Sequence, residues 1–531
     1  MAKEDAPKII TLDAAQLQEL LGQLEKHLPA SLFETVSAML RTLKWLMELI
    51  QKRDTTIRRL QRLIFGVKTE KGSNLLPEKP DDDPSGKSNA RKPAKKGHGR
   101  NGAKQYPGAR RVEVTHATLQ PGDLCPQCRT DKARLSRRTP SQIVRIIAQP
   151  IIQATLFSLE VLRCNLCGKT FTAAPPPQAG AAKYDDTVGV MIALMRFGAG
   201  MPHYRLAKMQ QDFGVPLPSA TQWELMEASS KPLEPPYKEL IRVGAQAALF
   251  HNDDTNMRVH DLKRDRTQSG SKRTGIFTTS IISKVGDHHV ALYYTGSNHA
   301  GENLAGLLEQ RAGGLEKPIH MCDALSRNLP KAFDCLLANC LPHGRRYFVD
   351  IMEAFPQECH KVINDLALVF KNDAQARNQG LSPSERLALH QQESGPVMDG
   401  LKKWMDEQVE QKKVEPNSGL GEAIAYMCRH WEALTLFLRV AGAPLTNNIC
   451  ERALKMAILH RKNSLAYKTE NGARVGDLFM SLIQTCRLAG ANPYEYLSSV
   501  VKNADRVRGD PHQWLPWNYT QSLATAEAEA N

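Results

Sequence analysis

Two pairs of cysteines with the same internal spacing constrain the fold of this chain more than any other feature. Each pair encloses two residues, and a stretch rich in Ile, Val and Leu over 141–163 lies between the pairs. Two such knuckles supply four thiolates, the ligand set of a closed tetrahedral zinc site that stabilises a fold and performs no chemistry. The sequence predicts a zinc ribbon within a zinc-binding domain over 113–178. Its ligands are Cys125, Cys128, Cys164 and Cys167.

These cysteines have two other interpretations. Four unrelated free thiols remain an alternative, whereas a redox pair is disfavoured because no thioredoxin-like βαβ pattern surrounds either knuckle. The total of 11 cysteines is odd, which fits a reduced chain with one metal site better than a disulfide framework. No apolar run approaches the ~18 residues that span a bilayer, and no signal-peptide core follows the first residues. We therefore expect a soluble cytoplasmic protein without membrane contact.

The charge of the chain is concentrated in one segment. Lys and Arg number 70 against 56 Asp and Glu, a net charge of +14, and no acidic residue occurs between Asp83 and Glu113. Residues 72–112 are also rich in Pro and Gly, so they predict a flexible basic linker that contacts a nucleic-acid backbone without reading sequence. A solubilising spacer is the alternative. The cations are Lys87, Arg91, Lys92, Lys95, Lys96, Arg100, Lys104, Arg110 and Arg111.

Helical patterns flank these two segments. Within 1–71, a short amphipathic helix is expected over 11–30, and the apolar spacing over 43–64, broken at Arg53, predicts a modest coiled coil that dimerises or folds back. A surface helix packed on its own domain is the alternative. Residues 179–246 form a predicted helical region, in which the turn before Ser219, a predicted helix cap, suits a helix-turn-helix DNA reader as well as generic helix packing.

After residue 246 the sequence pattern changes from helical to strand-like. The expected order is three strands, helix, strand, helix, strand, which is the layout of an RNase H-like fold. In this layout the ends of the first and fourth strands lie side by side, and Asp253 and Asp323 occupy those ends. The expected strands are 247–253, 275–283, 289–295, 318–322 and 346–349, and the helices are 301–313 and 325–338.

A third carboxylate completes a candidate metal site. Glu451 lies one turn into a helix that Thr446 or Asn447 can cap, and the helical stretch 352–440 is expected to be an insertion in a catalytic domain spanning 247–465. Asp253, Asp323 and Glu451 converging from two strand ends and a helix could hold two Mg²⁺ or Mn²⁺ ions. Such ions activate the attacking oxygen and stabilise the leaving oxygen of a phosphodiester.

With these residues in place, the chain resembles the transposases of the insertion sequence 66 family, bacterial mobile-element enzymes of the DDE type. The resemblance covers nearly the whole chain, including a C-terminal helical segment and tail over 466–531. Its ordered motifs are the two cysteine knuckles, Leu63–Lys71, Gly97-His98-Gly99-Arg100, Pro202-His203-Tyr204-Arg205, Asp253-Asp254-Thr255, His343-Gly344-Arg345-Arg346-Tyr347-Phe348, Asn447-Asn448-Ile449-Cys450-Glu451-Arg452-Ala453, Arg461-Lys462-Asn463-Ser464 and Asn492-Pro493-Tyr494-Glu495-Tyr496-Leu497.

The resemblance implies a multidomain α+β enzyme that cuts the ends of an insertion sequence and joins them to target DNA. It also implies double-stranded DNA as partner, a homo-oligomer, accessory proteins of the same element and a place on the bacterial nucleoid. A decayed transposase or DNA-binding regulator, and a structure-specific nuclease on the same fold, remain alternatives. Further expected contacts to DNA or the transition state, each of which could instead be a solvated cation, are His343, Arg345, Arg452, Arg461 and Lys462.

Overall fold

The computed structural model describes residues 14–27, 29, 32–40, 117–124, 127, 134–136, 151–163, 170–269 and 275–530. Three predictions lie outside these residues: the four zinc cysteines, the basic linker 72–112 and the coiled coil over 43–64. They stay predictions. Among the described residues, none of the helices combines the length and the hydropathy that crossing a membrane requires.

Short elements are described on either side of the two knuckles. The predicted N-terminal helix is confirmed as α1 (Ala14–His27), and residues 32–40 are also helical. Leu124 and Arg134 form an antiparallel bridge, and the Arg134 guanidinium donates to the Gly122 carbonyl at 2.8 Å. Further along the chain, β1 (Val161–Arg163) pairs antiparallel with β2 (Thr170–Thr172).

The predicted helical region is confirmed, with one correction. It comprises α3 (Asp186–Ala193), α4 (His203–Asp212), α5 (Ser219–Ser230) and α6 (Glu234–Gly244), with a π turn, η4, at Leu194–Gly198. Ser219 does not cap α5, because the cap position belongs to Pro218, whose side chain has no hydrogen-bonding group. The Gln222 amide instead donates to the carbonyls of Leu217 (2.8 Å) and His203 (3.1 Å), and so joins α5 to the start of α4.

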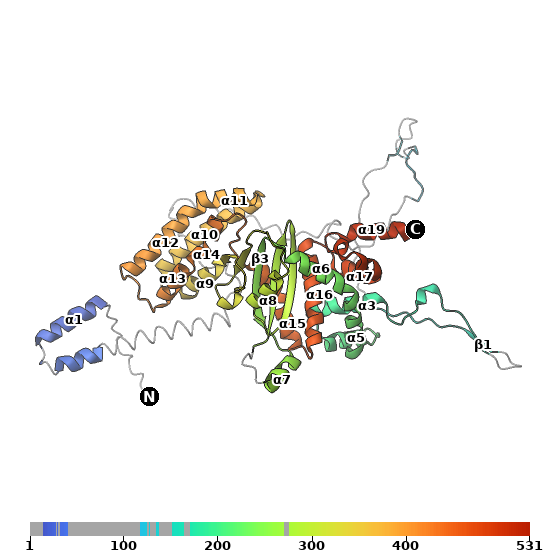
Figure 1. Ribbon diagram of the computed structural model, residues 1–531, viewed down its shortest axis with the longest axis horizontal. Helices are drawn as coiled ribbons and strands as arrows, with labels where there is room; N and C mark the ends of the chain where they lie inside the picture. The colour runs from blue at the N-terminus through green and yellow to red at the C-terminus, as the bar shows by residue number, and fades with distance from the viewer. Residues whose placement is uncertain are drawn as a thin grey trace. The chain divides into compact units, whose positions relative to one another are not determined.

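A mixed five-stranded sheet in the order β5-β4-β3-β6-β7 forms the centre of the fold (Figure 1). The predicted hairpin is confirmed: β3, β4 and β5 are antiparallel, and Gly286 supplies the left-handed residue of the β4–β5 turn (φ 56°). Strands β6 and β7 run parallel to β3. The bounds are β3 (Leu249–Asn256), β4 (Phe277–Val285), β5 (His288–Gly296), β6 (Ile319–Cys322) and β7 (Leu336–Asn339).

The last predicted helix and strand of this domain are wrong. Residues 325–338 hold a short 3₁₀ turn, η6 (Ser326–Asn328), and strand β7, whereas the expected strand 346–349 lies inside the helix α9 (Leu341–Ile351). Leu341, Gly344 and Phe348 are buried at helical spacing on α9, so tertiary packing overrides the strand preference of Tyr347-Phe348-Val349. The helix predicted at 301–313 is α8 (Ala300–Leu308) and ends earlier than expected.

Helices are present over most of the stretch 352–440, predicted to be an insertion, and they lie on the β7 side of the sheet, whereas α16 (Glu470–Ala489) covers the opposite edge at β5 (Figure 1). The insertion shares one apolar core with Met321 of β6 and Phe348 of α9. Its helices are α10 (Pro356–Asn378), α11 (Pro383–Leu389), α12 (Gly395–Glu410), α13 (Gly419–Arg429) and α14 (Trp431–Leu434).

The remaining helices complete the fold. Helix α7 (His260–Ser269) follows β3, and α15 (Asn448–Ser464) returns from the insertion to pack on β3 and β4. After α16 come α17 (Pro493–Lys502), α18 (Ala504–Gly509) and α19 (Tyr519–Ala530), which make the expected C-terminal helical segment.

Candidate active site

Two of the three predicted acids meet at the junction of β3 and β6. The parallel pairing of these strands matches Leu249 with Ile319 and His251 with Met321. Continuing this register by two residues puts Asp323, the first residue after β6, beside Asp253. Asp253 is not at the end of its strand as predicted, because β3 continues along β4 to Asn256. At Asp253, β3 is still paired with β4 but no longer with β6.

The electrostatics of the site reflect this close approach. Burial, and then the neighbouring negative charge of Asp323, raise the pKa of Asp253 to about 7. Burial also raises the pKa of Asp323, although the positive charges of His343, Arg346 and Arg327 oppose that rise. Two carboxylates in this setting repel each other, and a bound cation would relieve that repulsion.

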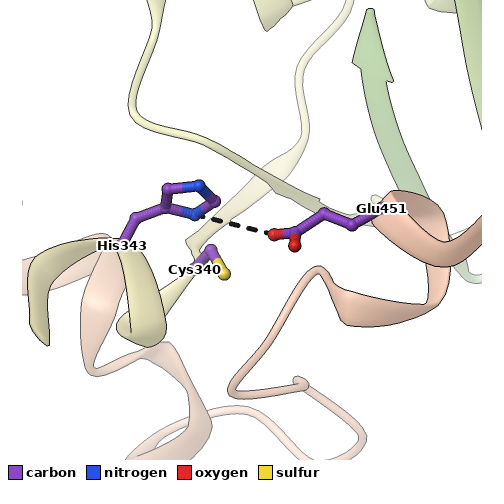
Figure 2. Close-up of side chains that lie close together, drawn as sticks. All are labelled: Cys340, His343 and Glu451. Atoms are coloured by element: carbon purple, nitrogen blue, oxygen red, sulfur yellow. Dashed lines mark ion pairs between the residues drawn. The ribbon is translucent and has the colours of Figure 1, made fainter. Parts of the chain in front are cut away.

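His343 lies between the second and third acids. Its Nδ1 is 3.2 Å from Asp323 Oδ1 and 3.8 Å from Glu451 Oε1, and Figure 2 shows the imidazole facing the glutamate. Neither contact is a hydrogen bond, and the second is too long to be one. Among the described residues, neither His343 Nδ1 nor Asp323 Oδ1 has a hydrogen-bond partner, although both atoms are buried. The two atoms contact each other as an ion pair, and a ligand that bridges them would complete their hydrogen bonding.

Cys340 adds a sulfur to the same place. One ligand atom each from Cys340, His343 and Glu451 lie within 4.8 Å of one another (Figure 2). The Asn447 backbone N–H donates to Cys340 Sγ at 3.3 Å, and burial raises the pKa of the thiol to about 12. The sequence analysis missed Cys340. The available signal was the Cys340-x-x-His343 spacing, which puts a sulfur and an imidazole in one turn at the start of α9.

Asn447 occupies the N-cap position of α15, one of the two predicted residues for it, but its side chain makes no capping hydrogen bond. The Asn447 amide instead donates to the Asn252 carbonyl (3.0 Å), and its Oδ1 accepts a hydrogen bond from His251 Nδ1 (3.1 Å). Both partners are buried β3 residues, so these bonds fix the start of the helix that carries Glu451 to the strand that carries Asp253.

A second buried layer supports the same strand. The Asn252 amide donates to the Asn328 carbonyl at 2.8 Å, and Asn252 Oδ1 accepts from His320 Nε2 at 2.9 Å. These bonds link β3 to β6 and to η6. The strand segments that present Asp253 and Asp323 are therefore held by side-chain bonds as well as by the sheet.

Asp254, next to the first acid, has partners of its own. Its Oδ2 is 2.9 Å from His299 Nδ1 and accepts from the Ala300 N–H at 3.4 Å, while its Oδ1 is 3.5 Å from Arg327. The side chain is 1% exposed. Asp254 is thus a hydrogen-bonded structural acid, whereas Asp323 forms an ion pair with His343 and its Oδ1 accepts no hydrogen bond among the described residues.

The predicted cations occupy different environments. His343 lies among the acids, Arg452 and Lys462 are exposed, and Arg345 is half-buried. The Arg461 guanidinium donates to Thr255 Oγ1 (2.9 Å) and to the Asn256 carbonyl (2.5 Å), so it holds the end of β3 to α15. Arg327, which sequence reasoning did not select, lies close enough to Asp323 to lower its pKa.

Comparisons with known proteins match this chain to one family. A family model described as "Transposase IS66 family" matches residues 184–475, more than half of the chain. Two similar chains come from Sinorhizobium fredii (strain NBRC 101917 / NGR234). Uncharacterized protein y4hP is 27% identical over 345 residues, covering 62% of this chain and 61% of its own length. Uncharacterized protein y4jD is 26% identical over 373 residues, covering 67% and 70%.

Proposed function

Because the chain belongs to the IS66 transposase family, we propose that it is a DNA transposase that cleaves the ends of its insertion sequence and joins them to target DNA. The observation that carries this proposal is the convergence of Asp253, Asp323 and Glu451 beside the buried Nδ1 of His343. The sheet order β5-β4-β3-β6-β7, with three antiparallel strands followed by two parallel ones, supports an RNase H-like catalytic core over 247–465.

The residues present fit a pair of hard divalent cations. Asp253, Asp323 and Glu451 would hold two Mg²⁺ or Mn²⁺ ions, which prefer carboxylate oxygens and supply Lewis-acid activation of a phosphodiester. The buried Asp323 Oδ1, which accepts no hydrogen bond among the described residues, and the raised pKa of Asp253 are what such a site has before it binds metal. The Cys340 sulfur is a poor ligand for these ions, so its role there would be to accept the Asn447 N–H.

The other side chains of the site position charge and substrate. His343, between Asp323 and Glu451, would orient the two carboxylates and face the phosphate that is attacked. Arg327 and Arg346 carry positive charge beside Asp323 and would contact nonbridging phosphate oxygens. Water would attack the phosphodiester at the end of the element, and the freed 3′-hydroxyl would then attack target DNA.

The parts of the chain around this core would serve DNA binding and assembly. The linker 72–112 would neutralise DNA phosphates, the coiled coil of 1–71 would hold a homo-oligomer together, and the helical region 179–246 would contact element ends. Accessory proteins of the same element, and an association with the nucleoid in the bacterial cytoplasm, belong to this proposal. The tail over 466–531 would buttress the core through α16.

A zinc ribbon over 113–178 is a separate part of the proposal. Full-length protein purified under reducing conditions should contain one zinc ion per chain, because the four thiolates bind metal only as this segment folds. Cys164→Ser should lose the zinc while cleavage chemistry at the distant acids persists on any DNA still bound. Metal analysis that finds no zinc in wild-type protein would contradict the prediction.

A strand-transfer assay with element-end DNA and Mg²⁺ or Mn²⁺ tests the proposed function. A transposase yields both cleaved ends and joined products. A nuclease on the same fold yields cleavage alone, and a decayed transposase or regulator binds the ends without cutting them. Asp334→Asn is a matched control for Asp323→Asn, since Asp334 is 73% exposed and forms a surface ion pair with Lys317.

A further inference from the structure

A second group of unpaired polar atoms lies between the helical region and α15. Arg196 follows α3 in η4, His203 begins α4, His460 lies on α15 and Tyr467 follows that helix. His460 comes nine residues after Glu451, about 13 Å along the helix, so this group is distinct from the acids. The buried atoms without partners among the described residues are Arg196 Nε, His203 Nε2, His460 Nδ1, His460 Nε2 and the Tyr467 hydroxyl oxygen.

Ring contacts hold these side chains together. The His460 ring stacks on Tyr467 (centroids 4.4 Å apart) and on Phe197 (5.5 Å). The Arg196 guanidinium carbon lies 5.5 Å from the same Phe197 ring centroid. The positive charge of Arg196, after burial, lowers the pKa of both His203 and His460, which places the guanidinium near both imidazoles.

The group carries the positive charge of Arg196, and its nearest acid is Asp477, whose negative charge, after burial, raises the pKa of Tyr467. Within the described part of the chain, no carboxylate pairs with Arg196, and burial lowers the pKa of its guanidinium. A buried arginine normally has an anionic partner, because leaving the charge unpaired is costly. The same charge argues against a metal cation at His203 and His460. Arg196 itself is half-buried, so the group reaches solvent on one side.

The hydrogen-bonding capacity of the group is mixed. His203 Nδ1 donates to Gln222 Oε1 at 3.0 Å, because the Gln222 amide nitrogen is already donating to two carbonyls. Neutral His203 therefore presents an acceptor at Nε2, while Arg196 and Tyr467 present donors and His460 presents one of each. An anion that also carries a proton would satisfy all of these atoms and balance the charge of Arg196.

We propose that Arg196, His203, His460 and Tyr467 bind a protonated phosphate group. The phosphate oxygens would accept from Arg196 and Tyr467, and the P–OH group would donate to His203 Nε2. Inorganic phosphate and the terminal monoester of a DNA strand share this chemistry, whereas a phosphodiester and sulfate at neutral pH have no proton to donate. The DNA source rests on the proposed function, but binding of inorganic phosphate does not.

Thermal unfolding of the full chain tests the site, with inorganic phosphate titrated at constant ionic strength and sulfate as the isosteric anion without a proton. Ligand that binds only the folded state raises the unfolding temperature with the logarithm of its concentration. We expect this rise with phosphate and a smaller one with sulfate. Arg196→Gln should weaken the apparent phosphate affinity by about tenfold or more, because it removes a charge-assisted hydrogen bond.

Arg205→Gln is the matched control, since Arg205 is an exposed arginine of α4 whose guanidinium contacts Tyr204. It should titrate like wild type. Equal responses to sulfate and phosphate, or an unchanged response in Arg196→Gln, would overturn the proposal. If Arg196→Gln does not fold, hydrogen exchange of the wild type decides: phosphate should protect residues 194–206 and 455–468, and no protection there refutes the site.

A competition experiment distinguishes inorganic phosphate from the phosphorylated end of a DNA strand as the ligand. A 5′-phosphorylated oligonucleotide that displaces phosphate, when its unphosphorylated counterpart does not, identifies a DNA end as the ligand. Failure of both oligonucleotides to compete identifies free phosphate. Loss of strand transfer in the assay of the acids would leave the phosphate titration unaffected, so the two proposals fail separately.

Discussion

The edge of the sheet at β5 and the acid site at the junction of β3 and β6 both place polar side chains against strands, but they differ in pairing. At the edge, three α16 side chains accept hydrogen bonds from backbone N–H groups of β5 at 2.7–3.0 Å. Helix positions four apart rise about 6 Å, close to the rise of two strand residues, so the repeats match. The pairs are Asp477 with Thr295, Ser481 with Tyr293 and Thr485 with Ala291.

The acid site has no such closure. Asp323 Oδ1 and His343 Nδ1 are buried without hydrogen-bond partners among the described residues, whereas both Asp477 oxygens accept from Thr295. Burial does not distinguish the two places, because it is the main cause that raises the pKa of both Asp477 and Asp253 to about 7. What differs is the hydrogen bonding of the oxygens: Asp253 Oδ1 accepts one bond, from the Asp254 N–H at 2.8 Å, and Asp323 Oδ1 accepts none among the described residues. Fully hydrogen-bonded acids close a sheet edge against other strands, and acids with unused hydrogen-bonding capacity are left for a ligand.

The largest expected effect comes from removing an acid of the candidate metal site. Asp253→Asn, Asp323→Asn or Glu451→Gln should each lower DNA cleavage and joining by about a thousandfold or more, because each change removes one charge from a site that would hold two divalent ions. The measurement is the rate of each step with element-end DNA. The double variant Asp253→Asn/Asp323→Asn should be no slower than either single variant, since the acids act as one unit.

Asp254→Asn is the comparison for that experiment. Asp254 already pairs with His299 and Arg327, so its loss should affect folding stability more than catalysis. A deeper loss of cleavage for Asp254→Asn than for Asp253→Asn would show that the paired acid, and not the unpaired one, serves the reaction.

A smaller catalytic effect is expected at Asn447. Asn447→Ala removes the bonds that fix the Glu451 helix to His251 and Asn252, so cleavage should fall about 10- to 100-fold, the usual effect of losing a residue that orients ligands. The apparent Mg²⁺ affinity should fall with it. Asn372→Ala also removes a buried amide, one that donates to Ser394 in the insertion, and should leave the cleavage rate per folded molecule unchanged. Equal losses in the two variants would reduce Asn447 to a stability role.

The sequence predicted the acids better than it predicted their supports. Asp253 and Asp323 follow recognisable apolar strands, and one register brings them together, so the sequence alone was enough to infer their meeting. The roles of Asn447 and Cys340 depend on contacts between segments more than a hundred residues apart, which no local pattern encodes. The strand expected at 346–349 failed for the same reason, because burial of Leu341, Gly344 and Phe348 on one face decides for helix α9.

The ionisation of Asp477 at the sheet edge should make the unfolding temperature depend on pH. The folded-state pKa of Asp477 is about 7, above its ordinary value of 3.8, so the carboxyl favours the folded state while protonated and that advantage is lost as pH rises from about 4 to 7. Asp477→Asn cannot ionise. The unfolding temperature of the variant relative to wild type should therefore rise between pH 5 and pH 8. A constant difference across that range would mean that Asp477 ionises as freely in the folded protein as in the unfolded one.

The smallest expected effect is a loss of stability at the sheet edge without a loss of catalysis. Ser481→Ala leaves the Tyr293 N–H of the edge strand without its acceptor, in a place closed to water, which costs about 1–3 kcal/mol of unfolding free energy. Cleavage and joining per folded molecule should stay at the wild-type rate, because Ser481 touches none of the three acids. The measurement is denaturant unfolding beside the strand-transfer assay. A large loss of strand transfer with little loss of stability would mean that the edge of the sheet also serves the reaction. The hydrogen bonding of polar groups would then no longer distinguish the catalytic site from the sheet edge.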